Sequence, residues 1–163
     1  MRMVLGVREV AGEGNNPMIM RWAEEIGAPD WYDNDDKPWC TVPANRSLMA
    51  VHLPMARHLD PRKRDGFDLL RAETFVHYGL PLEETTLGCI LVFKRPGGHH
   101  VAFYLGENDT HYCVIGGNQS NDVSIMWIKK ERCIAKRWPT DIPIPVSGPV
   151  RLTRTGVISN DEA

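Results

Sequence analysis

Three kinds of side chain in this sequence can together perform nucleophilic chemistry on a carbonyl: a cysteine, a histidine and an amide. Cys40 follows Trp39 and precedes a run of residues with helical periodicity, so we expect it at the N-terminus of a helix. The unpaired N–H groups of a helix N-terminus lower the pKa of a thiol and favour the reactive thiolate. Cys40 is therefore the candidate nucleophile, and the alternative is a small buried side chain without chemical function.

The candidate base belongs to a histidine pair, His99 and His100, at the start of an expected strand. A histidine held on a sheet opposite a cysteine at a helix N-terminus can accept the thiol proton. Because side chains alternate along a strand, His100 shares a face with the small Ala102, whereas His99 shares the bulkier face of Val101. We expect the nucleophile helix on the Ala102 face, which selects His100 and leaves His99 at an exposed turn edge.

A catalytic imidazole needs a polar group that orients its ring. The expected strand over residues 111–115 ends in Gly-Gly-Asn-Gln, residues 116–119. The side chain of Asn118 is the candidate, because asparagine has this role in cysteine peptidases of the papain type. An ordinary turn is the alternative interpretation of the same residues.

The elements that must position these residues come in the order helices, then strands. Asn16 before Pro17 predicts the start of a first helix, which Gly27 ends. The second helix begins at Cys40, and Pro43 is compatible with it only in the first turn. A third short helix is expected over residues 69–78.

Short runs of β-branched and aromatic residues follow and predict an antiparallel meander. They cover residues 89–93, 101–105, 111–115, 123–128 and, as a fifth strand, 133–138. Helices followed by a small antiparallel sheet of about five strands are typical of an α+β domain. We expect one domain over residues 1–140 and a Pro-containing extended C-terminal tail over residues 141–163, because 163 residues suit a single core.

Composition excludes several classes of function. The chain has 19 basic and 21 acidic side chains, so it lacks the basic excess of a nucleic-acid-binding protein. It contains no run of about 20 apolar residues that would insert into a membrane. We see no signal peptide and expect synthesis in the cytoplasm, where its four widely spaced cysteines would stay reduced.

Several motifs, in order, resemble one family. They are Gly-Glu-Gly-Asn-Asn-Pro at 12–17, Lys-Pro-Trp-Cys at 37–40, Gly-Cys-Ile-Leu-Val-Phe at 88–93, Gly-His-His-Val-Ala-Phe-Tyr-Leu-Gly at 98–106, Gly-Gly-Asn-Gln at 116–119 and Arg-Trp-Pro at 137–139. This series is similar to that of the small bacterial and phage cysteine peptidases of the NlpC and CHAP superfamily. The resemblance implies a papain-like fold, with N-terminal helices packed on the sheet, and cleavage of amide bonds in peptidoglycan peptides.

Residue by residue, the resemblance implies that Cys40 is the nucleophile, His100 the general base and Asn118 the orienting group. We assign Trp39 and Gln119, which flank these residues, to substrate binding. Peptidoglycan is the implied partner. If the protein comes from a phage, as an endolysin or a tail-associated enzyme with virion proteins as partners, it would act at the cell wall.

Two alternatives use the same fold. One is a catalytically lapsed structural or wall-binding module, and the other is a cytosolic amidase or acyltransferase with the same dyad. Asp33, Asp35 and Asp36 resemble the calcium loop of some CHAP enzymes, but calcium takes six to eight oxygen ligands and this loop lacks a full set. We therefore expect no metal and no other cofactor.

Overall fold

The computed structural model describes residue 1 and residues 4–153. Helix α1 covers Pro17–Glu25, and Asn16 caps it by accepting a hydrogen bond from the Met18 N–H at 2.9 Å. Pro17 occupies the first turn, where its missing N–H costs no hydrogen bond. The predicted first helix is therefore confirmed, together with its cap.

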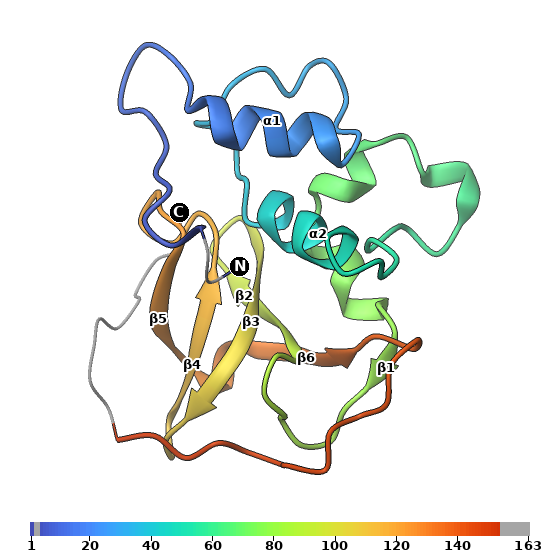
Figure 1. Ribbon diagram of the computed structural model, residues 1–163, viewed down its shortest axis with the longest axis vertical. Coiled ribbons are helices and arrows are strands. Elements are labelled where there is room, and N and C mark those ends of the chain that lie inside the picture. The colour runs from blue at the N-terminus through green and yellow to red at the C-terminus, as the bar shows by residue number, and fades with distance from the viewer. Residues whose placement is uncertain (2–3, 154–163) are drawn as a thin grey trace.

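Helix α2 covers Thr41–Met49, with Cys40 as the residue that precedes it. Pro43 lies in the first turn, as the sequence requires. Arg46 links the two helices, because its Nε donates to Glu25 at 2.6 Å and its guanidinium lies over the ring of Trp22. Figure 1 shows α1 and α2 together above one end of the strands.

The segment after α2 contains three short 3₁₀ helices, and the last two of them overlap the predicted third helix over residues 69–78. The three are η2 (Pro61–Lys63), η3 (Phe67–Leu70) and η4 (Ala72–His77). Arg71 has extended backbone, with φ −95° and ψ 116°, and separates η3 from η4. The prediction of a single helix is wrong because this residue interrupts the run of helical hydrogen bonds.

One antiparallel sheet follows, in the order β1-β6-β2-β3-β4-β5. Its strands are β1 (Leu80–Pro81), β2 (Ile90–Arg95), β3 (Gly98–Glu107), β4 (His111–Gly116), β5 (Ser124–Lys129) and β6 (Cys133–Trp138). The predicted meander holds from β2 to β5. The last strand crosses back to pair with β2, and the two-residue β1 makes a sixth strand. The chain is thus an α+β protein with helices on a small antiparallel sheet.

Helix α2 packs on the face of the sheet that carries Val92 and Val101. The opposite face carries Ala102 and Tyr104 in a separate apolar cluster, which also includes Val150 of the C-terminal segment. The expectation that α2 would lie on the Ala102 face is therefore wrong, and the strand-face argument that selected His100 over His99 is wrong with it. Ala44 of α2 is buried in the same cluster as Val92 and Val101.

The predicted tail returns to the sheet. The N–H of Glu107 donates to the carbonyl of Val150 at 2.8 Å, and the N–H of Leu152 donates to the carbonyl of Glu107 at 2.9 Å. Figure 1 shows this segment running along the bottom of the view, away from α1 and α2. The tail up to residue 152 thus contributes to the fold, and residues 154–163 lie outside the described residues. Within the described part of the chain, no helix is long and apolar enough to cross a membrane.

Candidate active site

Cys40 lies where α2 meets β3, and its side chain is buried, with 5% exposed. The backbone N–H groups of Val101 and Thr41 donate hydrogen bonds to its sulfur, and the guanidinium of Arg95 lies nearby. These donors and this positive charge lower the pKa of the thiol. Burial raises the pKa by more, so the net direction is upward. The expectation of a thiolate at neutral pH is therefore wrong for the unliganded protein, because desolvation outweighs the helix N-terminus.

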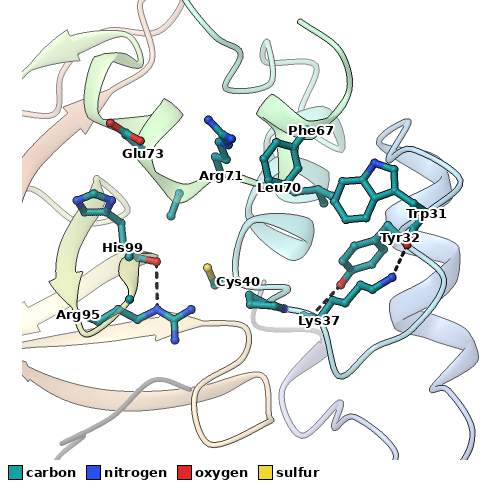
Figure 2. A pocket seen from close by; sticks show the side chains of 14 residues that line it. Trp31, Tyr32, Lys37, Cys40, Phe67, Leu70, Arg71, Glu73, Arg95 and His99 are labelled. Carbon is teal, nitrogen blue, oxygen red and sulfur yellow. Dashed lines mark hydrogen bonds between the residues drawn. The ribbon is translucent and has the colours of Figure 1, made fainter. Parts of the chain in front are cut away.

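A cavity of about 500 Å³ opens over Cys40. Figure 2 shows the sulfur between an aromatic wall on one side and charged side chains on the other. The aromatic wall consists of Trp31, Tyr32 and Phe67, and the charged side consists of Arg71, Glu73 and Arg95. Cys40 thus faces a space that a peptide can enter.

His100 is fully buried, and its Nε2 lies 3.2 Å from Oε1 of Gln119. The amide of Gln119 is oriented by a second hydrogen bond, from its Nε2 to the carbonyl of Ser124 at 2.6 Å. His100 directly precedes Val101, the residue whose N–H contacts the Cys40 sulfur. The backbone of β3 one residue after His100 thus contacts the Cys40 sulfur, while the ring of His100 contacts Gln119.

Asn118 does not orient His100. It has left-handed backbone with φ 56°, and its Oδ1 is buried with no hydrogen-bond partner among the residues that the structure describes. The left-handed residue turns the chain so that Gln119, one position later, points at the imidazole. The contact expected of Asn118 is made by the amide of Gln119 instead.

The proposed substrate contacts of Trp39 and Gln119 are not possible in this structure, because neither side chain is exposed. The indole Nε1 of Trp39 donates to Oε2 of Glu9 at 3.0 Å. Trp39 therefore helps to build the site from inside.

Two glycines allow close packing around the turn after β4, one against α2 and one against Gln119. A Cβ on Gly117 would lie 2.4 Å from Cγ of Pro43 and 2.8 Å from the ring of Trp39. A Cβ on Gly116 would lie 3.1 Å from Oε1 of Gln119. In the sequence these glycines are typical of a turn, but a Gly-Gly pair next to a candidate site residue also indicates close backbone approach.

His99 lines the cavity, half-buried, and its ring points away from Cys40 in Figure 2. Its carbonyl accepts a hydrogen bond from Nε of Arg95 at 3.4 Å. The described contacts of His99 thus give its ring no link to Gln119 or to the sulfur.

The acidic loop before Cys40 has internal partners. The fully buried Asp35 accepts hydrogen bonds from the N–H groups of Val10 at 3.1 Å and Asn16 at 2.7 Å. Asp33 pairs with Lys37 at 2.5 Å. Among the described residues, no group of three or more His, Cys, Asp or Glu side chains is arranged to hold a metal ion. Asp35 thus ties the N-terminal segment to the loop that leads to the nucleophile.

Comparisons with protein-family models, with curated proteins and with solved structures find no match to this chain. The assignment of function must therefore come from the arrangement of Cys40, His100 and Gln119 and from the motifs that contain them.

Proposed function

We propose that this protein is a papain-like cysteine amidohydrolase that cleaves amide bonds in peptidoglycan peptides. The observation that supports the proposal most is a single constellation. The sulfur of Cys40 accepts a hydrogen bond from Val101, and the preceding residue, His100, is held by Gln119. Nucleophile, base and orienting amide are the three groups that such an enzyme needs.

The hydrogen bonds of Gln119 assign the proton positions on His100. Its amide nitrogen donates to Ser124, so its Oε1 faces the imidazole and accepts a hydrogen bond from Nε2. In the neutral ring Nδ1 is then the basic nitrogen. Because burial keeps the Cys40 thiol protonated, its proton passes to Nδ1 as the sulfur attacks the substrate carbonyl.

The reaction then follows the acyl-enzyme route. Attack of the sulfur forms a C–S bond and moves the carbonyl electron pair onto oxygen, for which the N–H groups at the start of α2 are the candidate donors. Collapse of this intermediate breaks the C–N bond, and His100 returns the proton to the departing amine. Water, deprotonated by His100, hydrolyses the thioester and releases the carboxylic acid.

Peptidoglycan is proposed as the substrate because the motifs around Cys40, His100 and Gln119 resemble those of wall hydrolases. The open cavity with one aromatic and one charged wall is compatible with a peptide. Action at the cell wall, in an endolysin or in a phage particle, is part of the same proposal.

A second candidate is a catalytically lapsed wall-binding module. The observation that favours it is the raised pKa of Cys40, since a protonated thiol is a weak nucleophile. This module would bind purified cell walls without releasing fragments from them.

Release of fragments from purified sacculi tests the proposal. We expect the wild type to release fragments, Cys40→Ala to release none, and His100→Ala to lose about 10²-fold to 10⁴-fold in rate. His99→Ala is the comparison variant, because the assignment of the base to His100 requires a smaller loss in His99→Ala than in His100→Ala. Circular dichroism checks that all variants are folded. Equal activity of Cys40→Ala and wild type overturns the assignment, and binding without release identifies the lapsed module.

A further inference from the structure

The cavity over Cys40 has a local excess of positive charge, although the whole chain has a net charge of −2. Lys37, Arg71 and Arg95 line it, against one acidic side chain, Glu73. Cationic walls in a cavity focus the electrostatic field and attract anionic ligands. The charge at this site therefore differs in sign from that of the molecule.

The three cations are not equivalent. Lys37 is already engaged, since its Nζ contacts both Asp33 and the carbonyl of Trp31. Arg71 has an exposed side chain whose guanidinium lies 4.2 Å from the centroid of the Phe67 ring. Stacking holds the plane of a guanidinium and leaves its edge N–H groups to donate in a fork. Arg71 is thus oriented for a planar anion.

Arg71 also lines a second cavity. This cavity of about 320 Å³ shares Arg71 and Glu73 with the one over Cys40 and continues past His58 and His77. In this second cavity Arg57 already forms a two-bond ion pair with Asp68, at 2.8 Å and 3.1 Å. Glu73 lines both cavities, but only the cavity over Cys40 adds Arg95 to Arg71, so the favourable place for an anion is the Cys40 side of Arg71.

Arg95 lies on the other side of the nucleophile. It is the last residue of β2, and the hydrogen bond from its Nε to the His99 carbonyl holds the start of its side chain. Figure 2 shows the Cys40 sulfur between Arg71 and Arg95. An extended peptide whose carbonyl reaches Cys40 would therefore pass both guanidinium groups.

We propose that Arg71 binds a free carboxylate of the substrate peptide beside the scissile amide. This inference rests on the proposed function and adds a specificity: peptides with free carboxyl groups are preferred over the same peptides with carboxamides. A guanidinium forms two parallel, charge-assisted hydrogen bonds with a carboxylate, whereas a carboxamide is neutral and offers one oxygen acceptor.

Binding to the inactive Cys40→Ala protein tests the inference without catalysis. The probes are synthetic wall stem peptides, each made with free carboxyl groups and as carboxamides, and the readout is isothermal titration calorimetry. We expect the free acids to bind about 10-fold more tightly at low salt and to lose this advantage at high salt. Adding Arg71→Gln should abolish the discrimination, and Arg71→Lys should restore part of it.

Arg62→Gln is the matched control. Arg62 is an exposed arginine that pairs with Asp60 outside both cavities, and its removal should leave the discrimination unchanged. In the active protein, Arg71→Gln should raise KM for the free acids with little change in kcat. Equal affinity for acids and carboxamides, or an equal loss in Arg62→Gln, overturns the inference. Discrimination in binding without cleavage by the wild type contradicts the proposed function instead.

Discussion

The protonation of Cys40 is determined by two opposing effects at the start of α2. Hydrogen bonds from Val101 and Thr41 and the charge of Arg95 favour the thiolate, while burial favours the thiol. Burial is the larger effect, so the pKa lies above its ordinary value of 9.0. In the proposed reaction, Cys40 therefore forms its thiolate by proton transfer to His100 as it attacks, rather than existing as a resting ion pair.

Alkylation by iodoacetamide as a function of pH measures this balance. We expect the rate at Cys40 to rise with a midpoint above 9.0. Arg95→Gln should move the midpoint further up, because the guanidinium lowers the pKa. The Cys40→Ala protein gives the background from Cys133, which is the cysteine with partial exposure. A midpoint below 9.0, or no shift in Arg95→Gln, contradicts this description.

Gln119 orients the imidazole of His100 through the hydrogen bond at its Oε1. Gln119→Leu removes the acceptor for Nε2 of His100, so we expect kcat/KM to fall by about 10²-fold or more. Asn118→Gly is the control and should keep activity, because Gly adopts the left-handed backbone readily and Oδ1 makes no described hydrogen bond. Wall hydrolysis by both variants is compared; a larger loss in Asn118→Gly would return the orienting role to Asn118.

The sequence predicted which types of residue make up the candidate site, but it did not predict all of their positions. A cysteine before a helix, a histidine on a strand and an amide after Gly-Gly were all visible in the sequence. The choice between Asn118 and Gln119 depends on which residue takes the left-handed backbone, and asparagine is among the residues that do so most readily. Trp39 was expected to contact the substrate, but its indole is buried and donates to Glu9. The sequence did not indicate this partner, because Glu9 is distant from Trp39 along the chain.

At the scale of elements, the site depends on how closely α2 approaches the turn after β4. Pro43 and Trp39 pack directly on the backbone of Gly117, so the N-terminus of α2 is positioned by the absence of a side chain. Capping and periodicity predicted the two α-helices, because those signals lie within each helix. The pairing of β6 with β2 was missed, because no local pattern specifies a partner about 40 residues away.

Gly117→Ala tests this approach. The added Cβ would meet Cγ of Pro43 at 2.4 Å, so we expect destabilisation of about 1–3 kcal/mol and a larger loss of activity as α2 shifts from β3. Pro43→Ala in the same chain removes the nearest atom and should restore part of the stability. Urea unfolding of the two single variants and the double variant gives the coupling energy. Additive effects of the two changes would show that Gly117 and Pro43 do not constrain each other.

At the scale of the whole molecule, the face of the sheet opposite α2 is closed by buried polar and apolar groups together. Glu107 accepts hydrogen bonds from Thr85 at 2.6 Å, Tyr104 at 2.9 Å and Lys130 at 2.6 Å. The C-terminal segment pairs with the backbone of Glu107 through Val150. The network thus connects the sheet to the tail, which is why residues up to 152 belong to the folded unit although their composition suggested a separate extension.

The same face makes the protein sensitive to alkaline pH. Burial raises the pKa of Cys89 to about 12 from 9.0, and that of Tyr104 to about 12 from 10.0. Tyr112 is raised in the same way, to about 12. In the unfolded chain these groups lose their protons at lower pH than in the fold. Their contribution to stability is therefore complete below about pH 9 and is lost as the pH rises toward 12.

We expect the free energy of unfolding in urea to be steady up to about pH 9 and then to fall. Each group that deprotonates only in the unfolded chain adds a slope of up to about 1.4 kcal/mol per pH unit. Cys89→Ala is less stable at neutral pH because it leaves a small cavity. It should nevertheless show a smaller decline between about pH 9 and 10, the interval in which the unfolded cysteine titrates before the tyrosines. An equal decline in both proteins would show that Cys89 is not protected from ionisation by the fold.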